Sequence, residues 1–268
     1  MVVCGDSMEL NRDYESAAIY KWRKKRKKAF VLFICIVGIC FLVTRMVRVE
    51  DKTTVKVHNM HTEQNEKAIR YVASNMIKED PKIAITFDDG PSPAWTPQLL
   101  DGLKERNVKA TFFITAHYLN TQPELVKQMI DEGHIVGNHT VNHKSMPTLT
   151  EKQINSEVMD LHKSIYNQFG YEMKYIRPPM GEFSEKSISV TNSLGYKTVM
   201  WSFAYEDWNE NKQPEENSAK KKIIDNVHNG EVMLLHGNSK TNTNILGDII
   251  NEIKNMGYEF KSLDEFEK

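Results

Sequence analysis

The stretch Lys82–Pro91, which reads KIAITFDDGP, predicts a buried strand that stops at two adjacent carboxylates. Residues 82–87 are mostly apolar and rich in β-formers, whereas Asp88, Asp89 and the Gly-Pro pair after them are typical of a turn. Two neighbouring carboxylates repel each other unless a cation or a proton lies between them. We therefore expect a functional site at the end of this strand.

Outward from this stretch, short apolar segments alternate with amphipathic ones. One amphipathic segment has four apolar residues at helical spacing: Ile154, Val158, Leu161 and Ile165. Glycines such as Gly170 lie between a predicted helix and the next predicted strand, where a left-handed residue typically ends the helix. Seven segments have the composition of strands: Lys82–Phe87, Ala110–Thr115, His134–Asn138, Tyr175–Pro178, Lys197–Phe203, Glu231–His236 and Glu259–Leu263.

This alternation of strands and helices predicts a parallel sheet covered by helices. The chain has about seven strand–helix units and lacks the glycine fingerprint of a dinucleotide-binding sheet, which favours a barrel over an open sheet. The segment is shorter than the ~250 residues typical of a closed eight-unit barrel, so we expect a distorted or incomplete (β/α) barrel of about seven units. The active site of such folds lies at the carboxyl ends of the strands.

Charge and cysteine content narrow the possible functions. The chain has 268 residues and a formal net charge of −1 at pH 7, so its overall charge gives no reason to expect a nucleic-acid partner. Its three cysteines, Cys4, Cys35 and Cys40, all lie near the N-terminus. A metal ion bound after residue 40 must therefore use His, Asp or Glu, and no disulfide can form there.

The N-terminal segment carries a basic run followed by an apolar run. Lys21–Lys28 reads KWRKKRKK, and Ala29–Val43 follows as AFVLFICIVGICFLV. This order predicts a membrane helix ahead of the barrel, with a cytoplasmic N-terminus and the rest of the chain outside. One alternative is a cleaved signal peptide, although no A-x-A cleavage site follows the apolar run. The other alternative is a buried core helix. We expect four parts: a cytoplasmic basic segment (1–28), a transmembrane anchor (29–47), a stalk (48–80) and a catalytic domain (81–268).

Two histidines follow the third predicted strand. His139 and His143 lie in NHTVNH, and their spacing puts both imidazoles on one face if the segment turns as a helix. Two histidines and one carboxylate form the three-ligand set of a catalytic zinc site, with a position left for water. Two solvated loop histidines are the alternative. Together with the strand-end aspartates, the pair predicts one divalent metal ion, zinc in the first place, with cobalt or manganese able to share such ligands.

Polar residues at the other strand ends suit hydrolysis. One aspartate can bind the metal ion while the other takes a proton from water, and the spacing leaves open which does which. Arg177 can keep that base ionised through a charge-assisted pair. His236 is suited to protonate a leaving amine, and Asp207 can raise the pKa of His236 and fix its tautomer. These parts indicate metal-assisted hydrolysis of an amide or ester.

Apolar side chains beside these residues can wall a small pocket. Leu234 and Trp208 are the candidates, whereas Trp201 is interpreted as part of the core. The remaining histidines of this segment are interpreted as structural or surface residues: His117, His134, His162 and His228.

Five motifs resemble, in this order, those of the polysaccharide deacetylases of carbohydrate esterase family four, which share the NodB-homology domain. The motifs are TFDDGP, NHTVNH, RPPMGEFSE, WSFAYEDW and LLHG, and the resemblance covers essentially all of Lys82–Leu263. It implies that Asp88 is the catalytic base. It also implies a metal site, usually zinc, with these ligands: Asp89, His139 and His143.

The resemblance extends to the residues around that site. It implies that Arg177 pairs with the base and that Asp207 tunes His236, the general acid. Many family members have a second aspartate where Ala204 stands, and here Asp207 alone remains of that pair.

Substrate contacts are implied in the same way. The backbone amide at Met180 would stabilise the oxyanion, and Trp208 and Leu234 would enclose the acetyl methyl group. Many family members have tyrosine at the Met180 position, a change that a backbone role tolerates.

Three stretches, RPPMGEFSEKSI, WSFAYEDWN and GYEFKSLDEF, look like those of the delta-lactam biosynthetic de-N-acetylases of endospore formers. That subgroup commonly has arginine at the Met180 position. The resemblance implies removal of acetyl from N-acetylmuramic acid in spore cortex peptidoglycan, after an amidase has removed the peptide stem, with muramic δ-lactam as eventual product. The expected partners are the peptidoglycan glycan strand, the membrane and that amidase. The alternatives are deacetylation of N-acetylglucosamine or another glycan, and an inactive glycan-binding wall protein.

Overall fold

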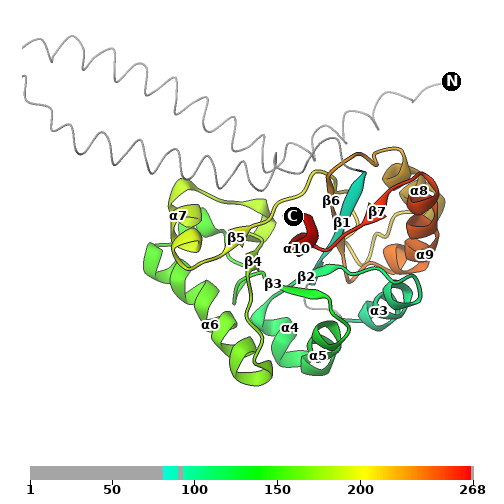
Figure 1. Ribbon diagram of the computed structural model, residues 1–268. Coiled ribbons are helices and arrows are strands. Elements are labelled where there is room, and N and C mark those ends of the chain that lie inside the picture. Colours follow the sequence, from blue (N-terminus) through cyan, green and yellow to red (C-terminus); the bar gives the residue numbers. More distant parts are fainter. Residues whose placement is uncertain (1–80, 90–92, 267–268) are drawn as a thin grey trace, which may run out of the picture. The chain divides into compact units, whose positions relative to one another are not determined.

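The computed structural model describes residues 81–89 and 93–266, in which a parallel sheet has helices on its outer side (Figure 1). The strands are β1 (Lys82–Asp89), β2 (Thr111–Ile114), β3 (Ile135–Asn138), β4 (Tyr175–Ile176), β5 (Lys197–Thr198), β6 (Glu231–His236) and β7 (Glu259–Phe260). Their order in the sheet is β5-β4-β3-β2-β1-β6, and β7 pairs with β1. The predicted parallel arrangement is therefore confirmed.

Helices connect successive strands. The bounds of the α-helices are α3 (Thr96–Glu105), α4 (Ala116–Thr121), α5 (Pro123–Asp131), α6 (Glu151–Phe169), α7 (Glu185–Ser193), α8 (Glu216–Ile224), α9 (Lys240–Asn255) and α10 (Leu263–Phe266). Two 3₁₀ turns, η1 (Met146–Thr148) and η2 (Pro179–Gly181), lie in the loops. Figure 1 shows α10 within the curve of the strands, while the longer helices lie outside it.

Helix α6 shows how the sequence sets these elements. Thr150 and Gln153 form a capping box at its start, and Gly170 ends it in a left-handed conformation with φ of 65°. The apolar residues predicted to share one helical face are all buried: Ile154, Val158, Leu161 and Ile165.

The pleat of β1 sends its side chains alternately to two cores. Ile83 and Phe87 pack in the larger cluster together with the outer helices, whereas Ala84 packs in a smaller cluster that includes α10. Because successive side chains of a strand point to opposite faces, Asp88 falls on the inner face with Ala84, and Asp89 falls on the outer face. The strand, which runs through both aspartates, therefore separates the two adjacent carboxylates.

The sheet is a half-barrel, which corrects the predicted fold class. Strands β4, β5 and β7 are two residues long, and β7 pairs with β1 rather than extending the row. No helix within residues 81–89 and 93–266 has the length and hydropathy to cross a bilayer. The predicted barrel of about seven units is thus wrong. Residues 1–80, including the predicted transmembrane anchor at 29–47, lie outside the described residues.

A buried carboxyl at the start of β6 makes the stability of this fold depend on pH. Glu231 is fully buried; its Oε2 accepts the His228 N–H at 3.2 Å, and its Oε1 has no partner among the described residues. Burial raises the pKa of Glu231 to about 8. The pKa of Glu231 in the folded state therefore lies above its pKa in the unfolded state. Its contribution to the free energy of unfolding is fully present at low pH and is lost as the pH rises toward 8.

Replacing Glu231 by glutamine should remove this dependence. We expect Glu231→Gln to gain about 2–3 kcal/mol of unfolding free energy relative to the wild type between pH 5 and pH 7.5. Denaturant unfolding of both proteins across this range measures the difference. Glu105→Gln is the matched control, since the Glu105 side chain is 71% exposed. A Glu231→Gln difference that stays constant with pH would contradict the assignment.

Candidate active site

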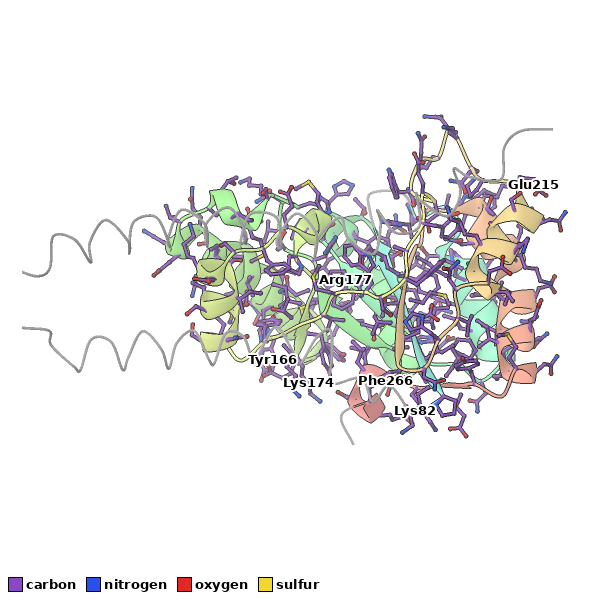
Figure 2. The ribbon with its side chains drawn as sticks, turned by 90° about the horizontal axis from the view of Figure 1, so that it is seen from above. Lys82, Tyr166, Lys174, Arg177, Glu215 and Phe266 are labelled. Carbon is purple, nitrogen blue, oxygen red and sulfur yellow. The ribbon has the colours of Figure 1, made fainter. Side chains whose placement is uncertain are left out.

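A buried ion pair joins the end of β1 to the residue that follows β4. Arg177 Nη1 donates to Asp88 Oδ1 at 2.7 Å, and Arg177 is completely buried. The guanidinium is held in place by the Val199 and Met200 carbonyl oxygens, at 3.2 and 3.1 Å, and lies over the Phe113 ring. Figure 2 shows Arg177 in the interior of the fold. The Arg177 guanidinium is therefore held in a fixed position before any substrate binds.

The electrostatics of this pair keep Asp88 ionised. Burial acts to raise the pKa of Asp88, but the charge of Arg177, assisted by His139 and His236, outweighs it and holds that pKa below the usual range. Asp88 Oδ2 remains directed toward His139, with 3.6 Å to the Nε2 atom. An ionised carboxylate with one oxygen anchored and one available suits a general base.

The two predicted histidines meet, but not through a helix. The loop after β3 turns back because Thr140 and His143 adopt positive φ angles of 69° and 52°. Asn138 Oδ1 stabilises this turn by accepting the Thr140 N–H at 2.9 Å. The Nε2 atoms of His139 and His143 consequently lie 3.1 Å apart.

The tautomer of His139 leaves Nε2 available as a ligand. Its Nδ1 lies 2.8 Å from the Arg177 carbonyl oxygen, an acceptor, so Nδ1 carries the proton. Burial lowers the pKa of His139 to about 4, and burial also lowers the pKa of His143. Both rings are therefore neutral at neutral pH, the form that binds metal ions.

The residues present fit a divalent metal ion in two respects. Two nitrogens bound to one tetrahedral zinc lie about 3.3 Å apart, close to the 3.1 Å between the histidine Nε2 atoms. Asp89 is buried, and neither carboxylate oxygen has a hydrogen-bond partner among the described residues. Gly237 makes room for this carboxylate, since a Cβ there would lie 1.7 Å from Asp89 Oδ1. A buried carboxylate without a partner calls for a proton or a cation.

Asp89 does not, however, lie with the histidines. The described part of the chain contains no group of three or more His, Cys, Asp or Glu side chains arranged to hold a metal ion. The reason is the extended backbone of β1, whose pleat turns Asp89 away from the inner face occupied by Asp88. Burial, followed by the charge of Asp88, raises the pKa of Asp89 to about 8.

A second carboxylate–imidazole pair lies at the end of β6. His236 pairs with Asp88 in the parallel register of β1 and β6. Its Nδ1 lies 2.7 Å from Asp207 Oδ1, and its backbone N–H donates to Asp207 Oδ2 at 2.9 Å. Burial acts to lower the pKa of His236, but the charge and hydrogen bond of Asp207 outweigh it and raise that pKa. A protonated imidazole with a fixed Nδ1–H suits a general acid.

The predicted pocket residues lie on different elements. Trp208 meets the His236 ring edge-on, with 5.7 Å between ring centroids, and is 40% exposed. Leu234 is buried in β6. Met180 lies in η2 with a φ of 56°, and its side chain is more than half exposed. Trp201 is half-buried and packs against the inner cluster.

The other histidines of the described residues lie away from these pairs. His134 Nδ1 accepts the Ala110 N–H at 3.1 Å, and His162 lies 2.7 Å from the Tyr196 hydroxyl. His228 Nε2 lies 2.9 Å from the Ser202 hydroxyl, and His117 is exposed on α4.

Sequence reasoning missed two residues of the acid site, Tyr205 and Asn242. Asn242 Nδ2 donates to Asp207 Oδ2 at 2.6 Å, and the Tyr205 hydroxyl donates to Asn242 Oδ1. The sequence offers one signal for Asn242, an asparagine shortly after the LLHG motif. That position is equally typical of a residue that caps a helix, so the signal does not indicate a role beside Asp207.

A half-barrel that carries a buried Asp–Arg pair, two facing histidines and an Asp–His pair at one edge is suited to the hydrolysis of an amide or ester. The family model "Polysaccharide deacetylase" matches residues 75–199. The chain belongs to this family, which confirms the predicted resemblance to carbohydrate esterase family four.

Particular relatives are similar over most of the domain. The chain is 43% identical to the peptidoglycan-N-acetylmuramic acid deacetylase PdaA of Bacillus subtilis over 69% of this chain and 72% of that protein. The solved structure of PdaA matches with a TM-score of 0.72 and 39% identity, covering 76% of this chain and 88% of PdaA. A peptidoglycan-N-acetylglucosamine deacetylase of Bacillus cereus is 34% identical over 73% of this chain and 92% of its own length.

Proposed function

We propose that this protein removes the acetyl group from N-acetylmuramic acid in peptidoglycan, on the path to muramic δ-lactam in spore cortex. The proposal is supported by the 43% identity to a deacetylase named for that sugar. The observation that carries the chemistry is the Asp88–Arg177 pair, with 2.7 Å between Oδ1 and Nη1, beside the facing histidines. Asp88 at the end of β1, His139 after β3 and His236 at the end of β6 all lie at the carboxyl edge of the sheet.

In the proposed reaction, water attacks the acetyl carbonyl carbon, the C–N bond breaks, and acetate and a free amine leave. Asp88 takes a proton from the attacking water, while Arg177 keeps Asp88 ionised and in place. His236 gives a proton to the departing nitrogen, and Asp207 holds the imidazole in the required tautomer. The Met180 backbone amide is the proposed donor to the oxyanion.

We further propose that the reaction depends on one divalent metal ion, zinc in the first place, with cobalt or manganese as possible substitutes. His139, His143 and Asp89 would hold it. When bound, such an ion polarises the acetyl carbonyl and lowers the pKa of water. The acetyl methyl group would lie against Trp208 and Leu234, which exclude water from the reacting carbon.

Mass spectrometry of digested peptidoglycan tests the substrate. Spores with the gene should contain muramic δ-lactam, and spores without it should keep N-acetylmuramic acid. Loss of acetyl from glucosamine only would sink the proposal in favour of the second candidate, an N-acetylglucosamine deacetylase. That candidate is supported by the 34% identity to the Bacillus cereus enzyme over 92% of its length. Unchanged acetylation of both sugars would favour an inactive glycan-binding protein.

Location and order of action follow from the proposed substrate. Peptidoglycan lies outside the cytoplasm, so the catalytic domain should be found outside it, and a purely cytoplasmic location on cell fractionation would contradict this. A δ-lactam joins the new amine to the lactyl carboxyl, which is free only after an amidase has removed the stem peptide. Spores lacking that amidase should therefore contain no muramic δ-lactam.

A further inference from the structure

A buried chain of hydrogen bonds runs from Tyr205 to the acid pair. The Tyr205 hydroxyl donates to Asn242 Oδ1, and Asn242 Nδ2 donates to Asp207 Oδ2 at 2.6 Å. Asn242 and Asp207 are completely buried, and Tyr205 is 2% exposed. Water cannot replace these bonds without opening the core, so each group depends on the partner that the fold supplies.

The chemistry of the chain allows only one orientation of the asparagine amide. Burial, followed by the charge of Asp207, raises the pKa of Tyr205, so the phenol keeps its proton and donates it. Asn242 Oδ1 must therefore face the tyrosine, and Nδ2 must face the carboxylate. The flipped amide would place Oδ1 against Asp207 Oδ2, acceptor against acceptor, and Nδ2 against the hydroxyl donor, so two buried hydrogen bonds would be lost.

This orientation fixes the carboxylate of Asp207. Asp207 Oδ2 accepts both Asn242 Nδ2 and the His236 backbone N–H, which leaves Oδ1 for His236 Nδ1 at 2.7 Å. Without Asn242, Oδ2 would keep only the His236 backbone N–H, so the carboxylate, and with it the imidazole, would be held less firmly. The rigid placement of the acid thus depends on a residue that touches no substrate.

The start of α9 holds Asn242 in position. Ser239 Oγ accepts the Asn242 N–H at 3.2 Å and donates to Gln213 Oε1 at 2.7 Å. Gln213 Nε2 in turn donates to the Asp207 carbonyl oxygen at 3.0 Å. The helix and the loop that carries Asp207 are therefore joined at two points.

We propose that Tyr205 and Asn242 are positioning residues that orient the general acid His236 through Asp207. This inference rests on the proposed deacetylation, in which the departing amine needs a proton. It makes Tyr205, which lies behind the site, a determinant of the rate of C–N cleavage and not of substrate binding.

Tyr205→Phe tests the proposal because it removes the hydroxyl and keeps the ring. On an N-acetylated glycan we expect kcat to fall about 10- to 100-fold with KM unchanged. On 4-nitrophenyl acetate, whose phenolate departs without a proton, the rate should change by less than about twofold. Asn242→Leu should lower kcat on the glycan at least as much, and adding Tyr205→Phe to it should have no further effect.

Tyr171→Phe is the matched control, since the Tyr171 hydroxyl accepts the Val136 N–H on a different part of the sheet. It should leave the ratio of glycan to ester hydrolysis unchanged. Equal loss of both activities in Tyr205→Phe, or an unchanged glycan kcat, would overturn the proposal.

An NMR measurement separates this proposal from the proposed function. In the ¹⁵N-labelled full chain, the Nδ1 proton of His236 should exchange with water faster in Tyr205→Phe than in the wild type and Tyr171→Phe. An identical His236 signal in all three proteins would overturn the network, whatever the activity. If exchange is faster in Tyr205→Phe as expected but the wild type releases no acetate from any glycan, the result would count against deacetylation alone.

Discussion

Replacement of Asp88 by asparagine should lower kcat for deacetylation by about 10²–10⁴-fold, the range contributed by a general base. The side-chain amide still accepts the Arg177 hydrogen bond that the carboxylate accepts at 2.7 Å, but it cannot take a proton from water. KM should change little, because in the proposed reaction Asp88 contacts the attacking water and not the glycan. Acetate release from N-acetylated peptidoglycan fragments measures the effect.

Folding must be controlled in this experiment, because Asp88→Asn leaves the fully buried Arg177 without a counter-charge. Breaking a buried pair in this way costs about 3–5 kcal/mol. Asp88→Glu keeps the charge but moves the carboxylate by one bond, so it should fold like the wild type and still lose most of its kcat. Asp101→Asn, exposed on α3, is the surface control. A folded Asp88→Asn with wild-type kcat would rule Asp88 out as the base.

The sequence contains enough to predict where the chemistry lies, because that depends on strand ends. The stretch Lys82–Phe87 is apolar enough to be buried on both faces, and it forms most of β1. Parallel strands share one carboxyl edge, so Asp88, Arg177 and His236 come together there although they are far apart in the chain. Proximity within the site could thus be deduced from topology alone.

The form of the sheet could not be deduced in the same way. Composition predicts a single strand over Lys197–Phe203, but β5 ends at Thr198. Phe203 instead forms an isolated parallel β-bridge with Met233 of β6. Similarly, Glu259–Phe260 pairs with the start of β1. Pairing partners are decided by tertiary packing and not by the local pattern, which is why the predicted barrel is in fact a half-barrel.

Local backbone conformation also escaped prediction. The four-residue spacing of His139 and His143 predicts adjacent rings by a helical argument, and the rings are adjacent, with centroids 4.7 Å apart. The cause is different, since Thr140 and His143 both have left-handed backbone conformations, which a β-branched residue such as threonine does not favour. The buried Asn242 amide is equally invisible in a sequence, because its partners Tyr205 and Asp207 lie in the loop between β5 and α8, far from Asn242 along the chain.

The proposed metal ligands give the second large effect. Removal of one histidine should lower metal affinity at least about 100-fold, since the loss of even an outer partner costs 10- to 100-fold. His139→Ala should therefore contain less than one-tenth of the wild-type metal after dialysis against metal-free buffer, and its activity should fall in proportion. Elemental analysis of the full chain provides the measurement. Wild-type activity lost to a chelator should return with zinc.

The same measurement decides between the two aspartates. Asp88 already has a fixed cationic partner in Arg177, whereas both oxygens of Asp89 lack a partner among the described residues. We therefore expect Asp89→Ala to lose the metal ion together with its activity, and Asp88→Asn to keep the ion while losing activity. Asp101→Ala should match the wild type in both. The reverse pattern would exchange the roles, making Asp88, whose Oδ2 lies 3.6 Å from His139 Nε2, the ligand. If Asp88 is the ligand, β1 keeps its extended form through Asp89 when the ion binds. If Asp89 is the ligand, as we expect, Asp89 must turn toward the histidines when the ion binds.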